Sequence, residues 1–516
     1  MVTELGRRYN AAETFIDAHR GVREDRVAFR CQGRSVTYGE LAANVDRAGN
    51  AMRDLGIQME QRVVIHVVDS PAFVYAFFGP IKIGAIPVPT NTLLSAHDLG
   101  YILEDSRAVA VVVSAPLLPK VLEIRGALPH LRHVLVTGAE APDGVLSFDD
   151  ALKAADTELD PADTTPDDAC FWLYSSGTTG FPKGAVHLQH DMLFCAETYG
   201  ANVLRSTEED RHFTVSPLFH AYGLGNGVFF PLHVGASSVL KPERATPDLV
   251  YDLITKERPT ILFTAPTFYA ALLAYPEQDF KYDLSSLRFA VSAGEALPKP
   301  LFDAWKKRFG TEILDGIGST EMLHIFISNF AGTARGGTSG TVVPGYKAKI
   351  VDDDGAELPA GESGHLWVSG DSACAYYWNK HEKTKATIRG EWLVTGDKYH
   401  LDADGSFTYE GRSDDMLKVS GQWVSPAEVE AALMGHAAVL EAAVVGVKDK
   451  DELTKPKAYV TLKNGRTGDD ALAEELKAFV KGRITPYKYP RWIVFTPDLP
   501  KNAAGKIQRY KLRELG

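Results

Sequence analysis

The stretch YSSGTTGFPKG, residues 174–184, places four small hydroxyl side chains, three glycines and one lysine in a single short loop. It follows the apolar run CFWLY (170–174) and precedes the amphipathic stretch LQHDMLFCAETYGANVL (188–204). Glycine lets the backbone approach an anion closely, and hydroxyl and N–H groups can donate hydrogen bonds to it. Lys183 adds a point charge. These features together predict a phosphate-binding loop.

The loop differs from the P-loop pattern GxxxxGK[ST] of nucleoside triphosphatases. Its glycines are spaced differently, and Gly184 follows Lys183 where the P-loop has serine or threonine. Phosphoryl transfer of that kind is therefore disfavoured. The alternative to a phosphate-binding loop is an ordinary surface turn, because serine, threonine, glycine and proline are common loop residues.

Length and composition are those of a soluble globular protein with more than one domain. The chain has 516 residues, which suggests two or three domains, with 45% hydrophobic and 24% charged residues. The formal net charge of -12 argues against nucleic acid or an anionic membrane as the main partner, because such partners need a basic surface. A small phosphorylated ligand needs only local positive groups.

The sequence predicts a cytoplasmic protein. Its cysteines contain no CxxC pair and are widely separated, which suits a reducing compartment. The N-terminal segment MVTELGRRYNAAETF lacks the apolar stretch of a secretory signal, and no uninterrupted apolar run reaches membrane-spanning length. The four cysteines are Cys31, Cys170, Cys195 and Cys374.

Short apolar runs rich in β-branched residues recur along the first part of the chain, each followed by a turn and a helical pattern. Such runs are typical of parallel sheets covered on both faces. Examples are RVVIHVVDS (62–70), AVAVVVSA (108–115), HVLVTG (133–138), TILFTAP (260–266) and LRFAVSAGEA (287–296).

The pattern changes near residue 337. Alternating strands and glycines, as in GHLWVSG (364–370) and GSFTYEG (405–411), predict an antiparallel region up to residue 411. Mixed helix and strand patterns return afterwards, as in SPAEVEAALMGH (425–436) and DDALAEELKAFVKGRI (469–484). They indicate a small separate α+β domain of roughly one hundred residues.

The loop at 174–184 is similar to the signature loop of the adenylate-forming superfamily of acyl- and aryl-CoA ligases, peptide-synthetase adenylation domains and luciferases. KGAVHLQHDM, HAYGLGN, GSTEMLHIF and KVSGQWVSP most resemble the benzoate–CoA ligase branch. The other family motifs follow in the expected order over nearly the whole chain: TYGEL (37–41), KIGAIPVPTN (82–91), PLFHAYGLG (217–225), SAGEALP (292–298), DGIGSTE (315–321), TGD (395–397), GRSDDMLKVSGQWVSPAEVE (411–430) and PKNAAGKI (500–507).

This resemblance implies an α/β fold in two parts. The N-terminal domain, residues 1–412, would bind ATP and the acid, and would contain two mostly parallel αβα sheets plus an antiparallel β-barrel-like region. The C-terminal domain, residues 413–516, would be a small, mobile α+β unit that carries a catalytic lysine. The implied reaction joins a carboxylic acid to a thiol through an acyl-AMP, with loss of diphosphate.

The resemblance also assigns the nucleotide site. Lys183 and the loop would hold the departing diphosphate, Thr320 would touch the α-phosphate, and Glu321 would hold Mg²⁺, which prefers oxygen ligands. Asp397 would accept from the ribose hydroxyls with help from Arg412. The other implied nucleotide contacts are Ser175, Ser176, Gly177, Thr178, Thr179 and Gly180 for diphosphate, and Gly294, Glu295, Ala296, Asp315, Gly316 and Ile317 for adenine. Many relatives carry an aromatic residue at the position of Ile317, which weakens any expectation of stacking on the base.

The small domain would serve both half-reactions. Lys506 matches the position that bridges the substrate carboxylate and the α-phosphate during adenylation. Asp414 matches the hinge about which the domain rotates between the two steps. Lys418, Gly421 and Trp423 would belong to the face used for thioester formation with coenzyme A.

The implied acid pocket is small and aromatic. His220 stands at the family's gate between the carboxylate site and the thiol tunnel, and we expect it to position groups and not to act as an acid or base. Ala221, Tyr222, Ile317 and His324 match the pocket of the benzoate branch. Tyr222 and His324 are expected to pack edgewise against a flat ring.

The sequence therefore predicts an ATP- and Mg²⁺-dependent, AMP-forming aryl-CoA ligase, an acid–thiol ligase of aromatic-acid degradation, acting on benzoate or a close analogue. Alternatives are a CoA ligase for a hydroxy- or aminobenzoate, furoate or a medium-chain acid, and an adenylating enzyme that loads a carrier-protein thiol. A regulatory nucleotide-binding protein is disfavoured by the intact set of Lys183, Glu321, Asp397, Arg412 and Lys506. We expect no nucleic-acid or membrane partner, and a monomer or homodimer.

Overall fold

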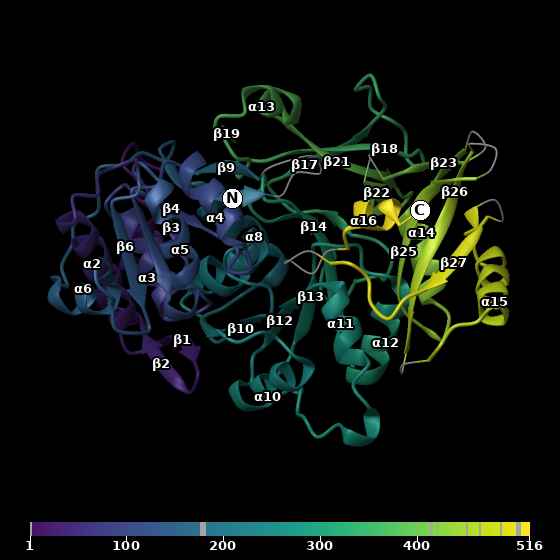
Figure 1. Cartoon of the computed structure of the whole chain (residues 1–516), viewed down its shortest axis with the longest axis horizontal. Helices are drawn as coiled ribbons and strands as arrows, with labels where there is room; N and C mark the ends of the chain where they lie inside the picture. Colours follow the sequence, from purple (N-terminus) through teal and green to yellow (C-terminus); the bar gives the residue numbers. More distant parts are fainter. Residues whose placement is uncertain are drawn as a thin grey trace.

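The computed structural model describes residues 3–175, 182–412, 415–419, 422–449, 453–463, 466–485, 488–501 and 507–515. Figure 1 shows a large N-terminal body, coloured purple to green, and a smaller C-terminal body, coloured yellow-green to yellow. Two largely parallel sheets and an antiparallel sheet make up most of the large body. The predicted mixed α/β fold with a separate C-terminal domain is confirmed.

The first sheet has five strands, and all its pairings are parallel. Val111 and Val113 of its central strand point into one apolar core, and Val112 between them points into another. Because both faces are buried, the strand reads as a continuous apolar run. In spatial order the strands are β4 (Ile86–Pro89), β3 (Arg62–His66), β5 (Ala110–Ser114), β6 (His133–Thr137) and β7 (Leu146–Ser147), covered by α2 (Tyr38–Asp54), α3 (Pro71–Lys82), α4 (Ala96–Asp105), α5 (Leu118–Ile124) and α6 (Phe148–Ala154).

The second sheet has nine strands, parallel through its centre and antiparallel at both edges. Its order is β16 (Thr341–Val342), β15 (Ile325–Ser328), β14 (Ile313–Gly318), β13 (Phe289–Ser292), β12 (Ile261–Thr264), β10 (Arg211–Thr214), β11 (Ser237–Leu240), β1 (Val27–Cys31) and β2 (Arg34–Thr37). Helices α10 (Pro247–Glu257), α11 (Pro266–Leu273) and α12 (Lys299–Phe309) connect strands of this sheet. The two sheets confirm the predicted pair of mostly parallel layers.

The phosphate loop connects two antiparallel strands, β8 (Ala169–Ser175) and β9 (Lys183–Leu188), and β19 (Tyr376–Tyr377) pairs with β9 from far along the chain. Within the amphipathic stretch 188–204, helix α7 (Asp191–Cys195) starts just after β9 ends. Helix α7 continues into the π-helical segment Ala196–Leu204, and a second π-helical segment, Gly225–Phe229, follows α8 (Ala221–Leu224) and leads into α9 (Phe230–Val234).

The predicted antiparallel region is a sheet of five strands. They are β17 (Lys347–Val351), β18 (Gly364–Ser369), β20 (Ile388–Arg389), β21 (Trp392–Leu401) and β22 (Phe407–Arg412), with α13 (His381–Thr387) beside them. The pairings run as an open path among the described strands, so closure into a barrel stays a prediction.

The C-terminal body has its own apolar core, which includes Leu417, Val429, Val444, Val460 and Leu476. Its sheet orders β25, β26 and β27, next to a small β23–β24 hairpin. Its elements are β23 (Leu417–Val419), β24 (Gln422–Val424), α14 (Pro426–Met434), β25 (Val439–Lys448), β26 (Thr454–Leu462), α15 (Asp470–Lys481), β27 (Trp492–Phe495) and α16 (Arg509–Glu514). The boundary between residues 412 and 413 stays a prediction.

Candidate active site

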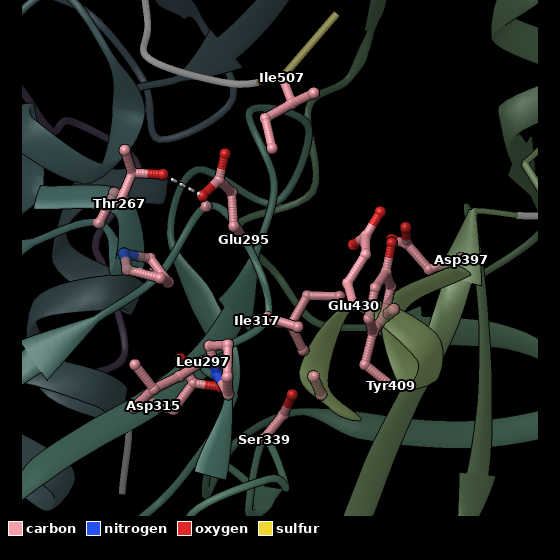
Figure 2. A pocket seen from close by; sticks show the side chains of 18 of the residues that line it. Thr267, Glu295, Leu297, Asp315, Ile317, Ser339, Asp397, Tyr409, Glu430 and Ile507 are labelled. Atoms are coloured by element: carbon pink, nitrogen blue, oxygen red, sulfur yellow. Dashed lines mark hydrogen bonds between the residues drawn. The ribbon is translucent and has the colours of Figure 1, made fainter. Parts of the chain in front are cut away.

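A cavity of about 2560 Å³ lies where the second sheet, the antiparallel sheet and the C-terminal body meet. Side chains from both bodies line it, and Figure 2 shows Glu295, Asp315 and Ile317 on one side and Asp397 on the other. The cavity gathers every sequence-predicted site residue whose side chain the structure describes: Ser175, Lys183, His220, Ala221, Tyr222, Gly294, Glu295, Ala296, Asp315, Gly316, Ile317, Thr320, Glu321, His324, Asp397 and Arg412.

The remaining predicted residues fall outside the part of the chain that the structure describes. Ser176, Gly177, Thr178, Thr179, Gly180, Asp414, Gly421 and Lys506 lie in the gaps of the described ranges, and Lys418 and Trp423 are described by their backbone strands alone. Ile507, directly after Lys506, lines the cavity. Met416 and Ser425, on either side of the β23–β24 hairpin, line it as well.

Charged side chains meet at the end of the cavity that lies beside the predicted phosphate loop. Ser175 and Lys183 lie opposite each other in the β8–β9 register, because they end and begin the two strands that flank the loop. Ser175 Oγ donates to Glu321 Oε1 at 3.1 Å, and Lys183 Nζ lies 3.8 Å from the same oxygen. The fold thus brings together the loop lysine and the motif glutamate, two of the sequence-predicted site residues.

Tyr377 also belongs to this end of the cavity, and sequence reasoning missed it. Its hydroxyl donates to Glu321 Oε1 at 2.6 Å and accepts from Lys183 Nζ at 3.2 Å. Burial and the Glu321 carboxylate raise the pKa of Tyr377 well above its usual range, so the phenol stays protonated. No local pattern marks it, because β19 reaches the site only by pairing with β9.

The backbone that presents Thr320 and Glu321 is held from behind by a buried pair. His187 Nε2 lies 2.8 Å from the Thr320 carbonyl oxygen, and His187 Nδ1 lies 2.7 Å from Asp191 Oδ2. A carbonyl oxygen can only accept a hydrogen bond, so in this contact the His187 ring donates to Thr320. The turn continues through Leu323, whose φ of 63° is left-handed, a conformation that costs energy and persists where the surroundings impose it.

A buried carboxyl lies in the part of the cavity where the sequence predicts the adenine contacts. Asp315 is 4% exposed, and its Oδ1 has no hydrogen-bond partner among the described residues. Burial raises the pKa of Asp315 to about 8. Beside it, Gly294 has a φ of 94°, which glycine adopts readily. Glu295 accepts a hydrogen bond from Thr267 at 2.8 Å, shown in Figure 2.

Asp397 and Arg412 are directly opposite residues of β21 and β22. Arg412 Nη1 donates to Asp397 Oδ1 at 3.1 Å and to the Thr395 carbonyl at 3.1 Å. The strand pairing therefore fixes the orientation of a partly buried carboxylate at the edge of the cavity.

The predicted acid pocket is lined by aromatic rings. Tyr222 and His324 lie 5.7 Å apart at an interplanar angle of 30°, and the Tyr222 hydroxyl donates to the Val291 carbonyl at 2.9 Å. Phe229 and Phe230, at the end of the second π-helical segment, pack edgewise on His324. Burial lowers the pKa of His324 to about 3, so its ring is neutral.

The family of the chain follows from this fold and site together with sequence comparison. Residues 16–378 match the AMP-binding enzyme family, and residues 428–506 match the AMP-binding enzyme C-terminal domain. The chain belongs to the AMP-binding enzyme family, whose CoA-ligase members use ATP and coenzyme A as substrates.

Several relatives share nearly the full length. A benzoate–CoA ligase of Thauera aromatica is 49% identical, covering 99% of this chain and 97% of the relative. A 4-hydroxybenzoate–CoA/benzoate–CoA ligase of Rhodopseudomonas palustris is 46% identical, covering 99% and 94%. The crystal structure of the anthranilate CoA ligase AuaEII with anthranoyl-AMP matches with a TM-score of 0.96 at 44% identity, covering 99% and 98%. A benzoate CoA ligase from Burkholderia xenovorans LB400 matches with a TM-score of 0.91 at 44% identity, covering 98% and 100%.

Within the described ranges, no helix combines the length and the apolar character needed to cross a membrane.

Proposed function

We propose that the chain is an ATP-dependent, AMP-forming aryl-CoA ligase that converts an aromatic acid, ATP and coenzyme A to the aroyl-CoA, AMP and diphosphate. One observation carries the proposal. A single cavity joins a paired lysine and glutamate, a buried carboxyl beside a left-handed glycine, and an apolar pocket of aromatic rings. These are the features needed to bind a triphosphate, a base and a flat carboxylic acid together.

The nucleotide end fits a base with a hydrogen-bonding edge. The unpartnered Oδ1 of Asp315 is a buried acceptor that lacks a donor within the described structure, and the base would supply one. Gly294 allows close backbone approach. Asp397 would accept from the two vicinal ribose hydroxyls while Arg412 fixes its orientation.

The phosphate end fits a magnesium ion held jointly by protein and phosphates. The described residues contain no cluster of three or more acidic, histidine or cysteine ligands, which suits an ion that takes one carboxylate and keeps phosphate and water oxygens. Glu321 would hold it. Bound there, the ion would neutralise phosphate charge during the attack of the carboxylate.

The chain's own residues would carry out the first step by positioning and charge. Lys183 and the loop after Ser175 would bind the departing diphosphate, and Thr320 would contact the α-phosphate. Lys506 would draw the acid carboxylate and the α-phosphate together, because both are anions that repel each other without a cation between them. Rotation of residues 413–516 about Asp414 would then withdraw Lys506 and present Lys418, Gly421 and Trp423 to the pantetheine thiol.

Benzoate or a close analogue is the proposed acid. The names of the relatives support this class, since they act on benzoate, 4-hydroxybenzoate and anthranilate. Tyr222 and His324 line the cavity with neutral side chains, and Phe229 and Phe230 pack on His324, so this side of the cavity is aromatic. The four free, buried cysteines support the proposed reducing, cytosolic location.

The experiment measures CoA thioester formation and diphosphate release across benzoate, hydroxy-, amino- and halobenzoates, furoate, hexanoate and acetate. Preference for benzoate-like acids is expected. Diphosphate release without a CoA thioester would refute the ligase and move the second step to a carrier-protein thiol. In the Lys506→Ala variant, adenylation should be lost while thioester formation from supplied benzoyl-AMP persists. Equal loss of both would refute the role of Lys506.

A further inference from the structure

The phenol of Tyr377 lies between the two opposite charges at the phosphate end of the cavity. Lys183 Nζ donates to the phenol oxygen at 3.2 Å, and the phenol donates to Glu321 Oε1 at 2.6 Å. The same ammonium group lies 4.2 Å from the centroid of the ring. Tyr377 therefore contacts the Lys183 ammonium group through its phenol oxygen and ring face, and it contacts the Glu321 carboxylate through its hydroxyl proton.

In this arrangement Lys183 and Glu321 do not form a direct, hydrogen-bonded ion pair. The 3.8 Å between Lys183 Nζ and Glu321 Oε1 is longer than a direct charge-assisted bond of about 2.8 Å. The two side chains are only 21% and 15% exposed, so water screens their attraction little. A direct contact would leave each group less able to bind a further charge.

The hydroxyl of Tyr377 has no part in the strand pairing of β19. Tyr377 pairs with Ala185 of β9 through the backbone, and its amide donates to Thr384 Oγ1 at 3.0 Å. The ring packs in a small core with Ala185 and Cys374. A change of the hydroxyl alone therefore leaves the contacts that hold the strand in place.

We propose that Tyr377 is a positioning residue for the adenylation step. It keeps Lys183 and Glu321 apart and oriented, so that Lys183 binds phosphate and Glu321 binds the metal cation. The proposal rests on the proposed function, because that phosphate and cation are those of Mg²⁺-ATP. Ser175 supports the same geometry by donating to Oε1, and the second Glu321 oxygen receives no donor from the described residues.

The test is Tyr377→Phe, which removes only the hydroxyl. We expect benzoate-dependent ATP–pyrophosphate exchange to fall roughly 10- to 100-fold, the loss of one charge-assisted hydrogen bond, and the Mg²⁺ needed for half-maximal exchange to rise. Thioester formation from supplied benzoyl-AMP and coenzyme A should stay within about twofold, because that half-reaction uses neither diphosphate nor the cation.

The matched control is Tyr38→Phe. Tyr38 is 1% exposed and donates to the Ala236 carbonyl at 2.6 Å, and it does not line the cavity. The variant loses a comparable buried hydrogen bond and should keep both half-reactions. Unchanged exchange in Tyr377→Phe, or equal loss of both half-reactions, would overturn the proposal.

A binding titration separates this proposal from the proposed function. The affinity for ATP is measured with and without Mg²⁺ by calorimetry, and Tyr377→Phe should lose roughly tenfold in the presence of Mg²⁺. A wild-type chain that binds Mg²⁺-ATP but adenylates no acid of the panel would refute the ligase, while the titration still decides the role of Tyr377. Equal Mg²⁺-ATP affinity in variant and wild type would refute that role.

Discussion

Replacing Asp315 with asparagine removes a buried ionisable group and nearly preserves its shape. Burial raises the pKa of this carboxyl from 3.8 to about 8. Between these two pH values the folded chain retains a proton that the unfolded chain has released. The wild type therefore loses stability as pH rises through this window, and its stability is greatest, as far as this group is concerned, below about pH 4.

The magnitude follows from the shift. A group that binds one more proton in the folded state changes the unfolding free energy by about 1.4 kcal/mol per pH unit. From about pH 5 to about pH 8 the wild type should lose up to about 4 kcal/mol through Asp315, an upper bound because relaxation and water penetration reduce burial costs. Asp315→Asn lacks this dependence, so its stability relative to wild type should rise over the same range.

Urea denaturation of both proteins near pH 5 and near pH 8 provides the assay. Asp283→Asn is the control, because Asp283 is exposed and its pKa is lowered by hydrogen bonds from Ser285 and Arg258, which confines its effect to acid pH. A stability difference between Asp315→Asn and wild type that stays constant with pH would refute the reasoning, since Asp315 would then be ionised in the folded chain throughout.

Three further predictions concern the groups around the reacting atoms. His187→Phe removes the donor to the Thr320 carbonyl, so ATP–pyrophosphate exchange should fall about tenfold and thioester formation from benzoyl-AMP should change less. His187→Gln should recover part of the exchange activity. A loss of activity that only follows the loss of thermal stability would count against a positioning role for His187. Gly225→Ala would place the new Cβ 2.5 Å from His324 Cδ2, which forces the His324 ring to shift in the predicted acid pocket. KM for benzoate should therefore rise more than KM for ATP. Unchanged KM values would mean that the ring can move without affecting the pocket. Asp397→Asn weakens the proposed acceptor of the ribose hydroxyls, so in steady-state kinetics KM for ATP should rise about tenfold and KM for benzoate should stay nearly constant. The reverse pattern would show that Asp397 does not bind the ribose.

The sequence predicted well those features that follow from burial or from a contiguous motif. Val111, Val112 and Val113 read as a parallel strand because alternate residues enter two different cores. Glu321 and Lys183 were each singled out because each stands in a motif of its own, and the fold brings the two side chains together. Strand β9, which begins at Lys183, was not predicted from KGAVHL; it pairs with β8 across the loop and with β19, which lies almost two hundred residues further along the chain.

Side chains that act through a distant partner escaped prediction for the same reason. Tyr377 acts on Glu321 from a two-residue strand, and nothing in AYYWNK distinguishes its phenol from that of Tyr376. His187 acts on a carbonyl 133 positions away, and backbone carbonyls have no signature in the sequence. The unpartnered oxygen of Asp315 likewise depends on packing by segments that are brought together only in the folded chain.

The π-helical segment Gly225–Phe229 makes the packing of His324, which lines the predicted acid pocket, sensitive to the number of residues in the chain at this point. Each residue of an α-helix turns the chain by about 100°, and a π-turn accommodates one residue more than the α-helical turn it replaces. Deleting one residue here would restore an ordinary turn and swing Phe229 and Phe230 away from His324. A single codon lost or gained at this point would thus reshape the pocket more than most substitutions, which makes it a natural place for enzymes of this fold to diverge in the acids they accept.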